Sequence, residues 1–247
     1  MENSMRDYLI DLVNHTHSLG NVNFIKIVAS DKSTAMAAMA EDNSVIINGK
    51  FKTALTEFEG TFGMPNLDKL NVILGIPEYE EDANITVQKQ KRNGNEVLVG
   101  LHFENKAGDF KNDYRFMTTE VVNEKLKNLK FKGVKWDVVI NPTLSAIQRF
   151  KFQVRANNEE PMFEVKTEKK NLLFFLGDVS SHTGNFVFES GVTGTLAKGW
   201  KWPVAPVISI LSLDGDKEMS FSDQGALLIK VDSGLIDYEY ILPAQQR

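Results

Sequence analysis

The sequence predicts an α+β protein of two similar domains, each with two helices packed on antiparallel sheets. Two observations support this prediction. One order of segments occurs twice with weak similarity: an apolar tetrapeptide, an acidic turn and two strand-like segments. The first copy begins with the tetrapeptide 73–76 and the second with the tetrapeptide 210–213. Leu9 and Leu144 lie in matching helical runs at nearly the same offset. One order of elements written twice indicates a duplicated domain, and half of 247 residues is enough to bury a core.

The first half is expected to contain a helix, four strands, a second helix and three strands. Apolar residues recur with helical spacing over 4–18. Asn66 is placed to cap a helix over 67–76, which Pro77 ends. The dipeptide Asn93-Gly94 indicates a hairpin between two strands. The expected strands are 21–30, 34–40, 44–48, 55–62, 85–91, 96–105 and 114–118.

The second half repeats this order. Asn141 and Pro142 are expected to open a helix over 142–155, with Leu144 and Phe150 on its apolar face. A short apolar helix is expected over 204–213. The final strand alternates apolar with mostly polar residues, so one of its faces should be buried. The expected strands are 162–167, 172–176, 185–190, 193–200, 218–222, 226–231 and 236–242.

These elements give an N-terminal domain at 1–119, a linker at 120–135 and a C-terminal domain at 136–247. The linker carries five lysines and no acidic residue after Glu124. Four of these lysines, at 125, 127, 130 and 132, are candidates for a nucleic-acid contact, although a solvated crossover is the simpler interpretation.

Composition excludes several classes of protein. The net charge of −5 is too negative to hold nucleic acid by bulk electrostatics, so any such contact must be confined to one face or be topological. The chain has no cysteine, and hence no disulfide or thiolate metal site. We expect neither a signal peptide nor a membrane span, because no suitable apolar run occurs.

The sequence gives little sign of catalysis. The acidic run at 78–82 is typical of a solvated turn, and Ser180, Ser181 and His182 are neighbours in a loop, whereas a triad is assembled by the fold. The remaining histidines show no metal-ligand spacing. We therefore expect no catalytic residue, metal or cofactor.

Four segments make the chain resemble the DNA sliding clamps, and most closely those of T-even-like tailed phages. They are Leu-Thr-Glu-Phe-Glu-Gly-Thr-Phe at 55–62, Leu-Asp-Lys-Leu-Asn-Val-Ile-Leu-Gly-Ile at 67–76, Leu-Ser-Ala-Ile-Gln-Arg-Phe at 144–150 and Tyr-Glu-Tyr-Ile-Leu-Pro at 238–243. The resemblance covers nearly the whole chain, and it depends on the order and spacing of elements more than on any single motif.

The resemblance implies a homotrimeric ring of six clamp domains, with helices around duplex DNA and sheets outside. Such a clamp has no active site. It tethers the replicative DNA polymerase to its template, confers processivity, and is opened by an ATP-driven clamp loader. The same resemblance implies viral DNA replication in the cytoplasm of a bacterial host cell, with phage late-transcription factors as further partners.

The resemblance also suggests functional residues. DNA contact is expected from Arg149, Lys151 and Arg155 on the helix 142–155, and from Arg6 on the first helix. A partner-binding pocket is expected at Leu129, Phe131, Leu242 and Pro243. Pairing of strand 114–118 with strand 185–190 of a neighbour would close the ring, which places Tyr114, Phe116, Phe186 and Phe188 at the subunit interface.

Three alternatives remain open. A β-rich module that binds single-stranded nucleic acid would need aromatic residues interleaved with cations, and Trp200-Lys201-Trp202 is the main instance. A hydrolase would need convergent polar groups around His182 or the acidic turn. A phage structural protein would share the β-rich composition.

Overall fold

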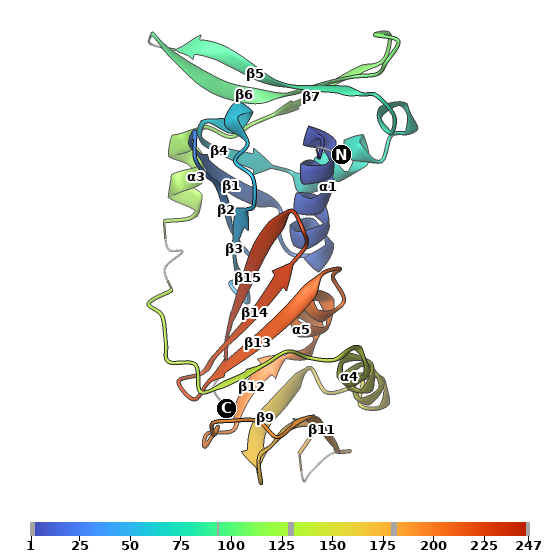
Figure 1. Ribbon diagram of the computed structural model, residues 1–247, viewed down its shortest axis with the longest axis vertical. Helices are drawn as coiled ribbons and strands as arrows, with labels where there is room; N and C mark the ends of the chain where they lie inside the picture. Colours follow the sequence, from blue (N-terminus) through green and yellow to red (C-terminus); the bar gives the residue numbers. More distant parts are fainter. Residues whose placement is uncertain (1–2, 93, 128–130, 179–181, 246–247) are drawn as a thin grey trace. The chain divides into compact units, whose positions relative to one another are not determined.

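The computed structural model describes residues 3–92, 94–127, 131–178 and 182–245. The chain forms two compact units, and the boundary differs in one respect from a simple division into halves. The first unit comprises Met1–Leu129 together with Ser233–Tyr238, and the second comprises Lys130–Asp232 and Glu239–Arg247. The last strand of the chain therefore begins in unit 1 and ends in unit 2 (Figure 1).

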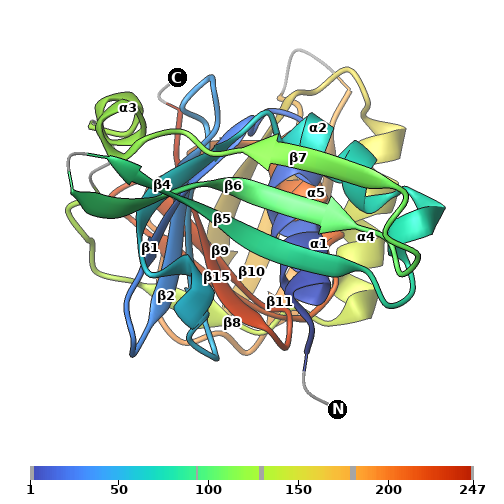
Figure 2. The same ribbon diagram turned by 90° about the horizontal axis from the view of Figure 1, so that it is seen from above.

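Unit 1 has two antiparallel sheets and two main helices. Its larger sheet has the order β4-β1-β2-β3 and continues with the start of β15, and its smaller sheet has the order β5-β6-β7. Figure 2 shows the smaller sheet crossing over α1, and α2 contacts both α1 and β7. The elements are α1 (Met5–Thr16), β1 (Phe24–Ala29), β2 (Thr34–Met39), β3 (Ile46–Phe51), β4 (Gly60–Pro65), α2 (Leu67–Leu74), β5 (Asn84–Arg92), β6 (Asn95–Glu104), β7 (Lys111–Arg115) and α3 (Thr119–Lys125).

Local sequence signals explain several of these boundaries. Ser4 and Asp7 form a reciprocal capping box at the start of α1. Asn66 caps α2 as predicted, and its side chain accepts from the Lys69 amide at 3.3 Å. The predicted hairpin is confirmed, because Arg92 pairs with Asn95 across the turn.

Unit 2 repeats the same plan after one additional short strand. Its sheets have the orders β11-β10-β9-β12 and β15-β14-β13-β8. The elements are β8 (Val138–Ile140), α4 (Leu144–Ala156), β9 (Met162–Glu168), β10 (Asn171–Leu176), β11 (Gly184–Ser190), β12 (Trp200–Pro203), α5 (Val204–Leu211), β13 (Asp216–Ser222), β14 (Ala226–Asp232) and β15 (Ile236–Pro243). The predicted order of helix, four strands, helix and three strands is thus present in both halves.

Aromatic rings fill the core of unit 2. Phe174 is fully buried and stacks on Phe188, with ring centroids 4.1 Å apart and planes 5° apart. Phe150 of α4 meets both Phe163 and Phe174. The face of α4 that carries Phe150 is therefore fixed against the sheet, and its opposite face is left for other contacts.

Several predicted elements need correction. Segment 55–62 begins with a 3-10 turn at Thr56–Phe58, which buries Phe58 between Phe62 and Phe116, and the strand starts only at Gly60. Segment 193–200 is mostly loop, because its amides bond to side chains: Leu196 to Thr167 and Lys198 to Asp223.

The expected linker is partly helical. Helix α3 buries Val122 completely and packs against β4. The last strand of the first half ends earlier than expected, at Arg115. Helix α4 begins after an N-cap at Thr143, whose hydroxyl accepts from the Ala146 amide, so the cap is not Asn141.

Candidate DNA-facing helix, partner pocket and subunit edges

Helix α4 carries the basic residues expected to face DNA. It contains Arg149, Lys151 and Arg155 and no acidic residue, so its net charge is +3. In contrast, α1 and α2 hold as many or more acidic than basic residues, and α5 holds no charge. Among these four helices, α4 alone is suited to phosphate by its charge.

The three cations of α4 differ in their surroundings. Arg155 is exposed in the last turn, whereas Arg149 leans onto strand β11. The Arg149 guanidinium donates to the Val187 carbonyl oxygen at 3.2 Å and lies 5.3 Å from the centroid of the Phe186 ring. Arg149 is therefore held beside the end strand of its sheet.

Lys217 adds a cation that sequence analysis did not identify. It lies at the start of β13, and its ammonium donates to the carbonyl oxygens of Leu213 at 2.6 Å and Gly215 at 2.8 Å. Burial lowers the pKa of Lys217, the charges of Asp214 and Asp216 oppose that shift, and the charge of Lys151 adds to it. Lys217 thus lies near Lys151 in the fold, but Asp214 and Asp216 are close to it as well.

Arg6 has a structural role. Its guanidinium donates to the Leu74 carbonyl oxygen at 2.9 Å and so satisfies a free carbonyl at the end of α2. The side chain is partly buried, and the bond ties α1 to α2. The Arg6 guanidinium would have to give up this contact to bind a phosphate.

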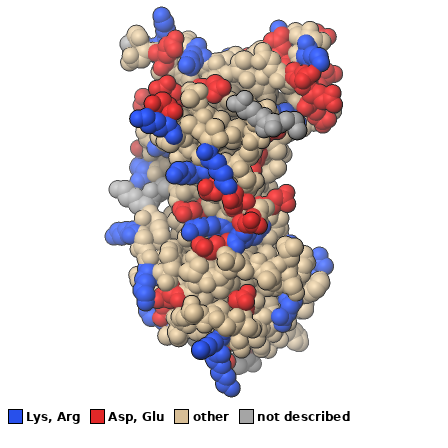
Figure 3. All heavy atoms as spheres, in the orientation of Figure 1, with Lys and Arg blue, Asp and Glu red and all other residues tan. Residues whose placement is uncertain are grey.

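Charges of both signs are mixed on the face that Figure 3 draws. Figure 3 shows lysines and arginines interspersed with acidic residues on one face. Two of the candidate lysines in the expected linker have local partners: Lys127 pairs with Glu124, and Lys125 lies 5.4 Å from the Phe24 ring centroid. Lys132 is exposed. Lys130 lies outside the described residues.

The expected partner pocket is only partly accessible. Leu242 is fully buried, because it lies on the same face of β15 as the buried Tyr238 and Tyr240, so its side chain does not line an open groove. Pro243 is exposed, and Phe131 is 38% exposed and stacked on Trp136 with centroids 6.2 Å apart. Leu129 lies outside the described residues.

The two strands expected at the subunit contact both lie at the ends of their sheets. Strand β7 ends the order β5-β6-β7, and β11 ends the order β11-β10-β9-β12. An end strand presents amides and carbonyls that another strand can pair with. The edges are therefore of the right kind for pairing between chains.

The aromatic residues named for that contact point inward. Tyr114, Phe186 and Phe188 are buried, and Phe116 stacks on Phe62 at 4.2 Å. Burial raises the pKa of Tyr114, whose hydroxyl donates to the Pro65 carbonyl. Alternation along a strand explains this correction: a neighbouring chain would meet the main chain of these strands and the residues between the aromatic positions. On β11 those residues are Asn185, Val187 and Glu189.

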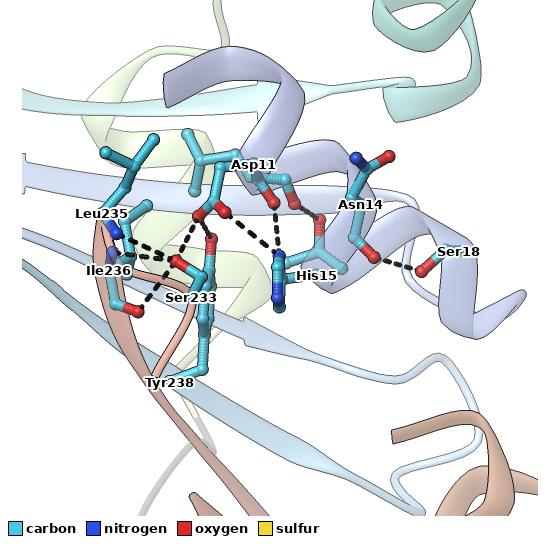
Figure 4. A network of polar contacts seen from close by, with 10 residues as sticks. Asp11, Asn14, His15, Ser18, Ser233, Leu235, Ile236 and Tyr238 are labelled. Atoms are coloured by element: carbon cyan, nitrogen blue, oxygen red, sulfur yellow. Dashed lines mark hydrogen bonds and ion pairs between the residues drawn. The ribbon is translucent and has the colours of Figure 1, made fainter. Parts of the chain in front are cut away.

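A network of hydroxyl, carboxylate and imidazole groups in unit 1 has the residue types of a hydrolase but a structural arrangement (Figure 4). Asp11 accepts from the hydroxyls of Ser233 at 3.0 Å and Tyr238 at 2.8 Å. The Ser233 oxygen in turn accepts from the amides of Leu235 and Ile236. Those bonds occupy the hydroxyl that a nucleophile would need free, and the network instead fastens the start of β15 to α1.

Other possible chemistries lack a site in the described part of the chain. No group of three or more His, Cys, Asp or Glu residues is placed to hold a metal among the residues described. No helix in those ranges is long and apolar enough to cross a membrane. Trp202 is fully buried, and Trp200 donates its indole N–H to the Asp223 carbonyl. The pair does not form an exposed platform for stacking bases.

Comparison with solved structures identifies the fold. The chain is similar to the PCNA of A. fulgidus, in a structure of the C-terminal region of FEN-1 bound to that protein, with a TM-score of 0.66, 11% identity and coverage of 98% of this chain and 96% of that one. It is also similar to PCNA from Thermococcus kodakaraensis, with a TM-score of 0.63, 14% identity and 98% coverage of both chains. For the proliferating cellular nuclear antigen of Entamoeba histolytica, the TM-score is 0.65, the identity 11%, and the coverage 95% and 94%.

The chain has the sliding-clamp fold. The predicted fold class is therefore confirmed over nearly the whole length. No protein-family model and no curated protein matches the sequence. The clamp fold is thus evident from the arrangement of elements, whereas sequence identity to these clamps is only 11–14%.

Within this clamp fold, exposed apolar side chains mark surfaces that periodicity did not reveal. Phe152 of α4 is 60% exposed, and Phe110, just before β7, is 41% exposed. Leu144 was expected on the buried face of its helix but is 82% exposed, because it is the first helical residue after the Thr143 cap. Helical spacing places Phe152 with Arg149 and Ser145 on the polar face of the helix. A phenylalanine on a polar face is the sequence signal that could have predicted this exposed apolar surface.

Proposed function

We propose that this protein is the subunit of a ring-shaped sliding clamp that encircles duplex DNA and tethers a DNA polymerase. The observation that carries the proposal is the match of 98% of the chain, both duplicated halves included, to the PCNA chains. Tethering raises the local concentration of a polymerase at the primer end without any new chemistry.

The charge distribution supports the proposal. A clamp that slides needs cations toward DNA that hold phosphate without reading sequence. Lys151 and Arg155 on α4 are the side chains we assign to this contact. We give Arg6 no phosphate contact, because its guanidinium caps α2.

The assembly we propose is a homotrimer in which β7 of one subunit pairs with β11 of the next. Both strands end their sheets, and main-chain pairing would extend the two sheets into one across each junction. The assembly would have three times the mass of the 27.8 kDa chain.

For partners, we propose a peptide tail of the polymerase or of a clamp loader. The A. fulgidus structure contains the C-terminal region of another protein bound to PCNA. Phe131 and Pro243 are the exposed apolar residues that we assign to such a pocket. A phage origin, late-transcription partners and a host-cell setting stay predictions from the sequence resemblance.

Two measurements test the ring and its threading on DNA. Light scattering over a concentration series should give a species with three times the chain mass of 27.8 kDa. With clamp loader and ATP, the protein should stay on nicked circular DNA in high salt and leave when the circle is cut, because a threaded ring is held by topology. A strict monomer at every concentration, or equal retention on cut and circular DNA, contradicts the proposal.

Charge reversal on α4 tests the phosphate contact separately. Lys151→Glu with Arg155→Glu should weaken loading and reduce its dependence on salt. The matched control is Lys89→Glu on β5, an exposed lysine far from α4 in the sequence. Equal loading by both variants refutes the assignment to α4.

A further inference from the structure

The duplication provides an internal template for the junction between subunits. In unit 1, the start of β15 takes the place beside β3, and α1 holds it there. The ring of Tyr238 stacks on His15 with centroids 4.6 Å apart and planes 5° apart, and its hydroxyl donates to Asp11 at 2.8 Å (Figure 4). In unit 2, the counterpart of β3 is β11, which ends its sheet.

Strand pairing gives the correspondence between α1 and α4. In unit 1, Ile27 of β1 pairs with Phe62 of β4, and in unit 2, Val165 of β9 pairs with Trp200 of β12. Each residue of the first pair is 138 positions before its counterpart. The same shift maps residue 11 onto 149 and residue 15 onto 153, and it agrees with the starts of the two helices to within one residue.

A second correspondence links β15 to β7. Met117 forms an isolated bridge to Gly63, and Gln245 forms the equivalent bridge to Lys201. The shift between Met117 and Gln245 is 128 positions. It maps Tyr238, the residue that α1 holds, onto Phe110.

The surface that corresponds to the Tyr238 site is hollow. A hollow of about 320 Å³ lies between α4 and β11, lined by Arg149, Phe152, Gln153, Ala156 and Phe186. Phe152 exposes 60% of its surface there. Phe110 is itself 41% exposed, while its ring packs against Tyr79 with centroids 5.6 Å apart. Both halves of a contact are thus present, each with uncovered aromatic surface.

We propose that Phe110 of one copy inserts into this hollow of a second copy, with the Arg149 guanidinium against its ring. The inference rests on the proposed ring and assigns side chains to its junction. Relative to the contact in unit 1, Phe110 stands in place of Tyr238 and Arg149 in place of Asp11, and these two changes match each other chemically. Tyrosine can donate a hydrogen bond to aspartate, whereas phenylalanine cannot, and arginine binds an aromatic face by a cation–π contact. Arg149 accordingly belongs to the junction, and the phosphate contacts fall to Lys151 and Arg155.

Cysteine cross-linking tests the contact directly, because the natural chain has no cysteine. The double variant Phe110→Cys, Gln153→Cys should give covalent dimers and trimers on mild oxidation, which reduction reverses. A disulfide forms only when the two Cβ atoms come within about 3.5–4.5 Å. The control pairs Phe110→Cys with Val28→Cys, an exposed position on β1, and should stay uncross-linked.

Assembly measurements give a second readout. Phe110→Ala should raise the dissociation constant of the trimer by about ten- to a hundredfold, as for a buried aromatic anchor. Arg149→Ala should weaken assembly less, and the double variant should lose less than the sum of the two effects. Circular dichroism checks that each variant is folded.

The outcomes separate this contact from the ring itself. A wild-type protein that is monomeric at every concentration overturns both. If the wild type is a trimer and Phe110→Ala leaves its dissociation constant unchanged, the contact is overturned and the ring stands. Equal cross-linking by the control variant with Phe110→Cys and Val28→Cys has the same meaning. A trimer with cross-links specific to residues 110 and 153 supports both.

Discussion

The bonds of Asp11 to the start of β15 predict a measurable coupling within unit 1. Tyr238 is 1% exposed, and its hydroxyl donates to the Asp11 carboxylate at 2.8 Å. Tyr238→Phe removes this bond but keeps the ring on His15. A hydrogen bond to a charged group contributes about 1.5–3 kcal/mol, so we expect the free energy of unfolding to fall by that amount.

Asp11→Ala should be costlier. It removes the bonds from both Tyr238 and Ser233, and although the Ser233 hydroxyl can still donate to the Ile236 carbonyl at 3.1 Å, the buried Tyr238 hydroxyl loses its carboxylate acceptor, for a loss of about 3–4 kcal/mol. Once Asp11 is absent, Tyr238→Phe no longer breaks that bond. The double variant should therefore be about 1–2 kcal/mol more stable than the sum of the single effects predicts.

Urea unfolding followed by circular dichroism measures these values at pH 7. All variants must be compared at one protein concentration, because assembly also stabilises the folded chain. Ser18→Ala is the control: its exposed hydroxyl bonds to the Asn14 carbonyl, and its loss should cost under about 0.5 kcal/mol. Effects of the two principal variants that add to within about 0.3 kcal/mol would refute the reasoning.

Three further predictions address the cores and one surface carboxylate. Phe174→Ala should cost about 3–5 kcal/mol in urea unfolding, whereas Phe175→Ala, half-buried on the other face of β10, should cost far less; similar losses would contradict the assigned core. Gly100→Ala would drive a methyl group into a β7 carbonyl and should therefore speed amide exchange in β6 and β7. Unchanged exchange would contradict the close approach of the Gly100 and β7 main chains. His102 lowers the pKa of Asp113, chiefly through a hydrogen bond, so His102→Ala should raise that pKa toward 3.8 in an NMR titration. The stabilisation from this bond is present above pH 3.8 and is lost as the pH falls through the lowered pKa of Asp113. An unchanged pKa of Asp113 in the variant would exclude His102 as the cause.

Elements set by local signals could be predicted from sequence. Turn and cap residues such as Asn66 and the pair at 93–94 act through their own neighbours in the chain, and periodicity showed the faces of the long elements. The duplication then supplied the second half from the first. For this reason, the order of elements and the fold class are confirmed even where individual boundaries shift.

Features that depend on distant partners could not be predicted. Strand β8 has only three residues and exists because it pairs with β13. The loop before Trp200 is held by Thr167 and Asp223, far away in the sequence. At the candidate site, sequence showed that Arg149 is basic and on the polar face, but its bond to Val187 depends on β11 lying beside α4. Burial of Ile241 likewise breaks the alternation that strand periodicity assumes, whereas Leu242 follows it.

The membership of Ser233–Tyr238 in unit 1 has a consequence for synthesis of the chain. All other residues of this unit are complete by Leu129, yet the segment that lies beside β3 emerges only after nearly all of unit 2 has been made. At ~5–20 residues per second, a translating ribosome needs roughly 5–20 s to supply it. During that interval β3 is a bare edge on a nascent protein, the situation in which strands from neighbouring nascent chains pair wrongly. We expect the nascent N-terminal unit to be the stage of biogenesis that most depends on chaperones.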